Sequence, residues 1–500
     1  MLTHNQDVIL KMKIQENIIY EIWKEKNFVR NLSTLDSQNI EVIDPGTQNK
    51  DSAGPDFQNA RIKFGNITYL GDVEIDSLHS DWKAHGHYFD KKYNKVILHI
   101  ILSKDRNQSY VFTKEGRKVP SISILDFLDK SFHTTILNAV EAEKKNRKFE
   151  MPCLGRNDSV HKSEKLQFLF ELGVERFRKK SKRLLDRLKE MIYLKEMNIR
   201  EPILKYDFGE DFHNKKFSTE NFNEIILWEQ LVYEMIFEAL GYSKNKEMML
   251  KLARAVNINF INNFRFDTQL GKIIESSLFF VSGLIPQKIK FAEEETSEYL
   301  RSVTETWNSV RNKYDGISFK RENWNFFKLR PQNFPTIRIA GGSALISNFI
   351  TNDMFRSYIE LFNHEHSIKE AVIHLRNLLI TEGQGYWTTH FNFDKKSKEK
   401  LNYFIGISRA DEIIVNVLLP VLFLYFELFN DPNAEKRVKN FYINYNQKAS
   451  NHLVEQVSTT LGLGKASTKS INYQAMIELF RNYCVKERCL ECKIGEKVFN

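Results

Sequence analysis

Apolar residues follow two different spacings along the chain, and the change comes near residue 160. In the first part, a helical spacing over residues 5–26 predicts a helix, and the polar and aromatic segment 77–93 is compatible with a second one. Short runs rich in β-branched residues predict strands at 40–43, 60–64, 67–75 and 95–103. The predicted order is helix, strand, strand, strand, helix, strand, which is a mixed α+β or α/β arrangement.

Helical periodicity predominates in the remainder of the chain. It predicts helices at 164–196, 221–241, 246–256, 268–284, 293–314, 412–429 and 470–484, with a proline- and glycine-containing loop at 329–344. We therefore expect an α/β domain over 1–140, a polar linker over 141–163 and a large, mostly α-helical domain over 164–500.

Composition narrows the class of protein. The 500 residues include only four cysteines, which excludes a disulfide scaffold and fits a reducing cytoplasm. The N-terminus lacks the unbroken apolar core of a secretion signal. The most apolar run, 413–429, is interrupted by Asn416, Pro420 and Glu427 and is shorter than a membrane span, so we expect a buried helix kinked near Pro420. The expectation is a cytoplasmic protein without a membrane partner.

Carboxylates mark two of the predicted strand ends. Asp56 precedes one strand, and Glu74 lies near the end of the next. Because side chains alternate along a strand, Asp72, Glu74 and Asp76 share one face, opposite Val73. Paired carboxylates are suited to Mg²⁺ or Mn²⁺, which polarises a phosphodiester and activates water. The alternative is a solvated strand edge without an ion.

Histidines gather directly after this strand, at His79, His85, His87 and His99. Imidazole titrates near neutral pH and ligates metals, so His85 and His87 are candidates for proton transfer or for a transition-metal site. The alternative is that they are solvated or hydrogen-bonded. His99, which lies between two apolar neighbours, is expected to be packed in the core.

The element order and the carboxylates resemble the core of PD-(D/E)xK nucleases, which is a restriction-endonuclease-like fold. The resemblance implies that Asp56 and Glu74 are metal ligands and that Glu16 or Glu21 is an auxiliary acid. Asp76 stands where the motif has its lysine. A substitute for that lysine is expected from His79, Lys83, His85 or His87.

Longer motifs resemble an uncharacterised Bacteroidota group, domain-of-unknown-function family 2851. They include SAGPDFQNA, GDVEI, SDWKAHGH, KLRPQNFPTIRIA and YCVKERCLECKIG. This resemblance covers nearly the whole chain and implies no established activity.

Three of the four cysteines lie close together near the C-terminus. Cys484, Cys489 and Cys492 have a C-x4-C-x2-C spacing, which is typical of metal ligands in a reducing compartment. The fourth ligand is expected to be Cys153 or a histidine. Both zinc and an iron–sulfur cluster fit this spacing, and free buried thiols are the alternative.

Positive charge is concentrated in one stretch of a chain whose net charge is +9. Residues 161–200 hold 12 Lys and Arg against 6 Asp and Glu, which contributes +6. One face of the predicted helix carries Arg176, Lys179, Lys180, Arg183 and Arg187, and the loop 329–344 carries Arg330 and Arg338. Such groups are typical of phosphate binding. The alternative is a solvated face for the helix, and for the loop it is ion pairs between its arginines and acidic helix surfaces.

Together these features predict a divalent-metal-dependent nuclease acting on DNA or RNA. The alternatives are a catalytically degenerate nucleic-acid-binding protein that keeps the nuclease scaffold, and a scaffold for protein assembly.

Overall fold

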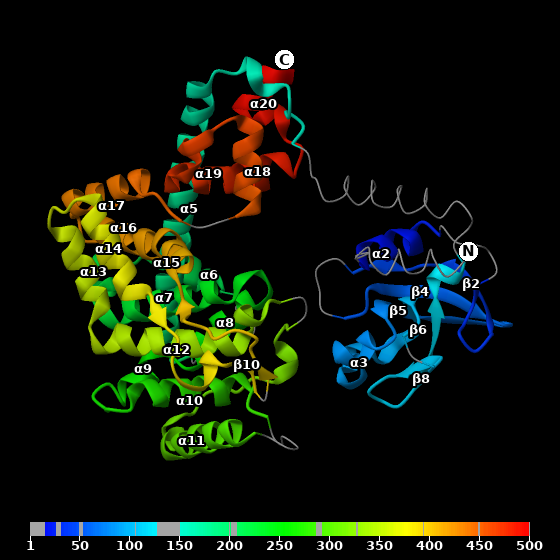
Figure 1. Cartoon of the computed structure of the whole chain (residues 1–500). Coiled ribbons are helices and arrows are strands. Elements are labelled where there is room, and N and C mark those ends of the chain that lie inside the picture. Colours follow the sequence, from blue (N-terminus) through cyan, green and yellow to red (C-terminus); the bar gives the residue numbers. More distant parts are fainter. Residues whose placement is uncertain are drawn as a thin grey trace. The chain divides into compact units, whose positions relative to one another are not determined.

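The computed structural model divides the chain into two compact units, Met1–Glu150 and Met151–Asn500, here called unit 1 and unit 2. Each is described by itself (Figure 1). The structure describes residues 16–26, 32–49, 54–105, 107–127, 151–199, 201, 208–286, 293–326, 329–393, 395–448 and 451–499.

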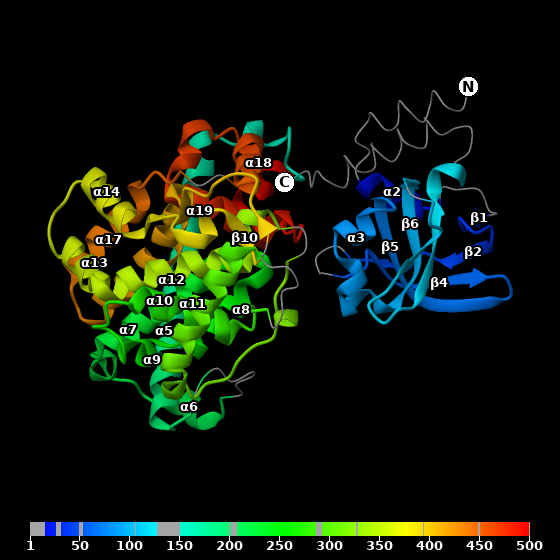
Figure 2. The ribbon, with the colours of Figure 1, turned by 60° about the horizontal axis from the view of Figure 1, so that its bottom comes forward.

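Unit 1 is built on one mixed sheet with the strand order β1-β2-β4-β5-β6-β8-β7, and β3 pairs with β4 (Figure 2). Neighbours are antiparallel from β1 to β5, while β5–β6 and β6–β8 are parallel. The strands are β1 Leu32–Ser33, β2 Asn39–Asp44, β3 Thr47–Gln48, β4 Phe57–Phe64, β5 Ile67–Leu78, β6 Val96–Ser103, β7 Tyr110–Phe112 and β8 Lys118–Ser123.

All four predicted strands are present in this sheet, as β2, β4, β5 and β6. The predicted first helix appears as α2 (Glu16–Lys24), and its residues 5–15 lie outside the described part of the chain. Segment 77–93 forms short helical turns rather than one helix: α3 (Asp81–Ala84), η1 (His87–Phe89) and η2 (Lys91–Lys95). Gly86, with φ +81°, breaks the helix between the first two turns.

The core of unit 1 explains why polar groups are buried beside it. Val73, Ile75, Leu98 and Ile100 are fully or almost fully buried on the central strands β5 and β6. The last part of β5 is covered on both faces, because its burial is continuous from residue 71 to 76. Residues on the polar face of β5 are therefore buried as well, instead of facing water.

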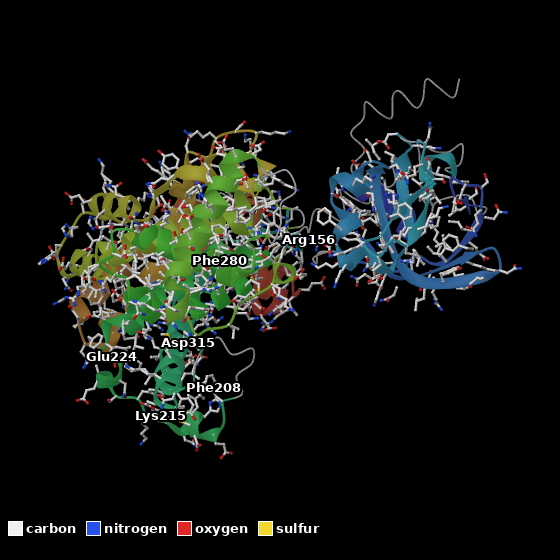
Figure 3. The ribbon with its side chains drawn as sticks, turned by 90° about the horizontal axis from the view of Figure 1, so that it is seen from below. Arg156, Phe208, Lys215, Glu224, Phe280 and Asp315 are labelled. Atoms are coloured by element: carbon white, nitrogen blue, oxygen red, sulfur yellow. The ribbon has the colours of Figure 1, made fainter. Side chains whose placement is uncertain are left out.

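Unit 2 is mostly helical, as the sequence predicts. Its longest helix, α5 (Lys162–Glu196), packs against α7, α16 and α19. Side chains fill the space between its helices, and α7 begins directly after Glu224 (Figure 3). The main helices are α7 Ile225–Leu240, α8 Tyr242–Ala255, α10 Leu270–Ser282, α11 Glu294–Val310, α12 Pro335–Thr351, α13 Met354–Asn363, α14 Ile368–Leu379, α15 Ile407–Ile413, α16 Leu419–Leu428, α17 Pro432–Asn444, α18 His452–Leu461, α19 Ser470–Leu479 and α20 Lys493–Phe499.

Helices α13, α14, α17, α18 and α20 were not predicted from the sequence, and two other segments of unit 2 differ from what was predicted for them. Residues 335–344 of the predicted loop belong to α12, because Pro335 suits the first turn of a helix. Gly341 and Gly342 fit within this helix because it packs closely against Phe404 and Phe237. A Cβ at either position would collide with one of these side chains. Residues 151–161 of the predicted linker lie within unit 2, where they form a short turn, η4 (Asn157–Ser159), ahead of α5.

The apolar run near Pro420 is a buried, irregular helix. A π-helical turn, η10 (Ile414–Leu418), separates α15 from α16, and Pro420 follows it within the first turn of α16. Proline lacks an N–H and displaces the preceding carbonyl, which accounts for the widened turn. Within the described ranges, no helix is both long and apolar enough to cross a membrane.

Candidate metal centre

The polar face of β5 forms the centre of the candidate site. Glu74 lies opposite His99 of the parallel neighbour β6, and His99 lies opposite Ser121 of β8. Asp56 immediately precedes β4, whose first residue, Phe57, pairs with Val73 of β5. The sheet register thus brings two carboxylates and an imidazole to one place, although they are far apart in the sequence.

Asp56 and Glu74 are held by each other's strand. The backbone N–H of Asp56 donates to Glu74 Oε2 at 3.0 Å, and the N–H of Ile75 donates to Asp56 Oδ2 at 3.0 Å. The hydroxyl of Tyr20, on α2, donates to Asp56 Oδ1 at 2.6 Å. Both carboxylates are buried, so their positions are fixed by hydrogen bonds rather than by water.

Asp76 is surrounded by three histidines. Its Oδ1 lies 2.9 Å from His85 Nδ1, and its Oδ2 lies 3.1 Å from His99 Nε2. His87 Nε2 lies between two carboxylates, 3.0 Å from Glu74 Oε1 and 3.9 Å from Asp76 Oδ1. Asp76, at the position where the nuclease resemblance implies a lysine, is thus the carboxylate that orients the histidines.

The turn between His85 and His87 depends on Gly86. At φ +81° the chain reverses between the two histidines, so that both reach Asp76 although they are only two residues apart. A Cβ at this position would also lie 2.6 Å from the ring of Phe89. His87 is buried between Trp82 and Tyr93, with ring centroids 5.3 and 4.0 Å away, whereas the His85 side chain is 44% exposed. His85 is the member of the cluster that reaches solvent.

The electrostatics follow from burial and from these contacts. Burial, together with the negative charge of Asp56, raises the pKa of Glu74 well above its ordinary value. Burial acts to raise the pKa of Asp76 too, but its contacts with His85, His87 and His99 hold it far below its ordinary value. The hydrogen bond to Asp76 raises the pKa of His85. Burial opposes protonation of His87, yet contacts with Asp76 and Glu74 raise its pKa to about 10.

One set of these groups is compact enough to share an ion. Ligand atoms of Asp76, His85 and His87 lie within 4.8 Å of one another, and Glu74 adjoins them through His87. Two imidazoles with carboxylates suit Mn²⁺, Zn²⁺ or Fe²⁺ better than Mg²⁺, which prefers oxygen ligands alone. The donors present thus fit a divalent transition metal.

The other predicted members of the site have different positions. His79 is buried, with its ring centroid 5.5 Å from that of His99, and Lys83 is exposed on α3. Asp72 accepts a hydrogen bond from the N–H of Asn59 at 3.1 Å, at the bulge in β4. Glu16 and Glu21 belong to α2, the helix that carries Tyr20.

Sequence reasoning missed two contributors to the site. Tyr20 holds Asp56, and the Ser121 hydroxyl lies 3.0 Å from His99 Nδ1. Ser121 was hidden because strand β8 was not predicted. Its pattern, KVPSIS, contains a proline and two serines, which are weak strand formers.

A comparison with known proteins shows the family of this chain. The family model described as "Protein of unknown function (DUF2851)" matches residues 16–219 and 214–452. The chain belongs to the DUF2851 family. No curated protein and no solved structure matches it.

In this DUF2851 protein the predicted phosphate-binding strip of α5 faces other helices. Arg187 is buried and donates to Glu234 of α7 through Nε and Nη2, both at 2.8 Å. Lys180 donates to Gln474 at 2.8 Å, and burial lowers its pKa well below the ordinary value. Neither residue can contact a phosphate, because helices α7 and α19 cover the polar face of α5.

The remaining residues of the strip are also paired. Arg176 and Lys179 bind Glu478 of α19 at 3.0 and 2.9 Å, and Arg183 binds Glu238 of α7. The strip therefore forms ion pairs within unit 2, which neither the phosphate-binding prediction nor its alternative, a solvated helix face, described.

The two arginines of the predicted loop have separate fates. Arg338 is buried in α12, where it donates to the carbonyl of Phe404 at 3.0 Å and to the hydroxyl of Tyr242 at 2.8 Å. The prediction of a phosphate contact is wrong for this residue. Arg330 is exposed just before η8 (Pro331–Asn333).

All four cysteines of this DUF2851 protein line one small cavity in unit 2. Cys153, Cys484, Cys489 and Cys492 surround it together with apolar side chains, among them Leu479 and Ile494. None of the four forms a disulfide. Cys153, rather than a histidine, lies beside Cys484, Cys489 and Cys492.

Proposed function

We propose that this DUF2851 protein is a divalent-metal-dependent phosphodiesterase acting on nucleic acid, with its active site in unit 1. The observation that supports this best is the buried cluster of Glu74, Asp76 and His87, which reaches solvent through His85. Burying several ionisable groups costs free energy, and such clusters are therefore found preferentially at functional sites.

Each residue has a distinct role in this proposal. Asp76, His85 and His87 hold the metal, since their ligand atoms lie within 4.8 Å of one another. A bound divalent ion supplies Lewis acidity toward a phosphate oxygen and generates a water nucleophile at neutral pH. Ser121 and Asp76 fix the ring of His99 from both nitrogens, which keeps Asp76 oriented toward His85.

Asp56 and Glu74 complete the site from the neighbouring strand. The N–H of Asp56 positions Glu74 Oε2, which leaves Oε1 facing His87. Glu74 is thereby placed to accept a hydrogen bond from a water or to join the ligand set. The carboxylate of Asp56, fixed by Tyr20 and the N–H of Ile75, contributes negative charge beside the ion.

The surface next to His85 favours a nucleic-acid substrate. The turns from α3 to η2 expose Lys83, Lys91 and Lys92, which complement phosphates. Between them Tyr88 and Phe89 are 46% and 51% exposed, with ring centroids 4.9 Å apart. Exposed aromatic rings beside positive charge are typical of surfaces that stack nucleotide bases.

The test is cleavage of labelled single- and double-stranded DNA and RNA by the purified full chain, with Mn²⁺ or with EDTA. We expect cleavage with Mn²⁺ that EDTA abolishes and that falls at least about tenfold in His85→Gln, because loss of one ligand weakens metal binding. The matched control is His364→Gln, an exposed histidine of unit 2.

Binding without cleavage at any metal concentration would contradict the catalytic proposal. It would favour instead the nucleic-acid-binding protein that keeps the scaffold. Neither binding nor cleavage would contradict both.

A further inference from the structure

We infer that Cys153, Cys484, Cys489 and Cys492 ligate a [4Fe–4S] cluster in unit 2. This site is separate from the proposed active site, and neither proposal depends on the other. It joins residue 153, at the start of unit 2, to the C-terminal segment of the chain. Helix α20 contacts both η4 and α5, and its red ribbon lies beside the start of the unit (Figure 1).

The ligand set is purely soft. Among the described residues that line the cavity, the four cysteines are accompanied by apolar groups and Tyr483, with no carboxylate or histidine. Thiolates alone select zinc or iron–sulfur clusters, whereas hard ions require oxygen. Three of the cysteines are buried, and Cys489 is partly exposed.

The spacing of the sulfur atoms separates a cluster from a single zinc ion. In a tetrahedral zinc site with Zn–S bonds of about 2.3 Å, all sulfur atoms lie about 3.8 Å apart. Among the described cysteines, no three sulfur atoms lie within 4.8 Å of one another. Cysteines that bind different iron atoms of a cluster are farther apart, because inorganic sulfide separates the irons.

A buried cation beside the cavity matches the charge of such a cluster. Lys165, in the first turn of α5, is buried, and its Nζ donates to Asn157 Oδ1 at 2.6 Å and to the carbonyl of Leu461 at 3.3 Å. Both acceptors are neutral. Asn157 in turn donates to the carbonyl of Cys153 at 2.8 Å. A buried ammonium group needs negative charge nearby, and a cluster with four thiolates supplies it.

The local backbone is built around the same loop. Helix α20 begins right after Cys492, and a Cβ at Gly495 would lie 2.2 Å from the carbonyl of Cys489. Glycine at this position lets the helix approach the turn that carries two of the ligands.

The experiment is anaerobic reconstitution of the full chain with ferric iron, sulfide and a thiol reductant, which reduces half of the iron to the ferrous state. We expect four iron atoms and four acid-labile sulfides per chain, with the broad visible absorption of a cluster. Cys489→Ser should lose most of that absorption. Leu490→Ser, an exposed neighbour in the same loop, should retain it.

Metal analysis of the untreated chain keeps the test decisive if a cysteine variant fails to fold. Stoichiometric zinc that iron and sulfide do not displace would overturn the inference, as would four thiols that stay metal-free after reconstitution. Lys165→Met should keep the cluster but lower its reduction potential, because loss of a nearby positive charge disfavours the added electron. An unchanged reduction potential would contradict the proposal that the charge of Lys165 stabilises the cluster.

Discussion

Both units bury carboxylates, but they surround them with different partners. In unit 2, Asp411 receives both nitrogens of the Arg376 fork at 2.7 Å, and also the hydroxyl of Tyr445 and the N–H of Lys448. In unit 1, Glu74 and Asp76 meet histidines. An arginine is always charged, so it neutralises a carboxylate permanently, whereas a histidine can release its proton and ligate a metal.

The comparison separates a structural use of buried charge from a chemical one. The carboxylate of Asp411 has its hydrogen-bonding capacity filled by fixed donors, which leaves it nothing to offer a ligand. The two carboxylates of unit 1 share imidazoles that an ion can compete for. The following experiments test this contrast, from the largest expected effect to the smallest.

Removing the arginine of a closed pair should cost the most stability. Arg376→Met leaves Asp411, which has no exposed surface, without its counter-charge. We expect the free energy of unfolding of unit 2 to fall by about 3–5 kcal/mol, measured by chemical denaturation. Arg356→Met is the control, because its pair with Asp353 is exposed, and it should cost at most about 1 kcal/mol. Equal losses in the two variants would break the comparison.

Glycine substitutions should separate backbone strain from loss of the site. Gly86→Ala and Gly116→Ala both place alanine at a φ near +80°, which costs about 1–2 kcal/mol. Of the two, only Gly86 lies between histidines that are proposed as metal ligands, and only there does the added methyl group meet a neighbour, Phe89. Gly86→Ala should therefore weaken Mn²⁺ binding, measured by calorimetry, and Gly116→Ala should leave it unchanged. If Mn²⁺ binding were unchanged in both variants, the turn at Gly86 would have no role in forming the site.

A smaller effect is expected from the hydroxyl behind His99. Ser121→Ala deletes the partner of His99 Nδ1 and should cost about 1 kcal/mol of stability. It should also weaken Mn²⁺ binding about tenfold, because groups that orient a ligand's neighbour tune the metal site. Ser123→Ala is the control on the same strand, where the hydroxyl reaches only the carbonyl of Leu102 at 3.4 Å. If both serine variants bound Mn²⁺ alike, the role of Ser121 would be refuted.

The smallest expected effect concerns the acid sensitivity of a buried carboxylate that is paired with arginines, Glu234. Burial acts to raise the pKa of Glu234, but Arg187 and Arg254 hold it below the ordinary 4.5. Its contribution to stability is therefore present above about pH 4.5 and is lost as the pH falls through the lowered value. Melting temperatures between pH 7 and pH 3 should fall less steeply in Glu234→Gln than in the wild-type chain. Glu360→Gln, an exposed control, should keep the wild-type slope, and identical slopes in all three would contradict the prediction.

From the sequence, the secondary structure was predicted more completely than the contacts between side chains. Period-two and helical patterns located β2, β4, β5 and β6 and the helices α5, α7, α8, α10, α11, α16 and α19, because those patterns follow from which faces are buried. They did not locate α13, α14, α17, α18 or α20. The helix α12 was missed because its glycines and prolines were interpreted as a loop. In the structure, contacts with Phe237 and Phe404 make those glycines suitable for a helix.

The candidate site was only partly predictable. Alternation along β5 placed Glu74 and Asp76 on one face, and proximity in sequence indicated His85 and His87. The pairing of His99 with Asp76 depends on a parallel β5–β6 register, which no local pattern encodes. The basic face of α5 was misassigned for a similar reason, since the carboxylates that cover it come from α7 and α19.

The most direct test of the account is Mn²⁺ binding to the EDTA-treated full chain, measured by calorimetry and by the spectroscopic signal of free Mn²⁺. The hard ion avoids the cysteine site, because thiolates prefer softer metals. The account predicts one bound ion per chain, lost in Asp76→Asn and retained in Asp411→Asn. Absence of Mn²⁺ binding by the wild-type chain, or undiminished binding by Asp76→Asn, would contradict it.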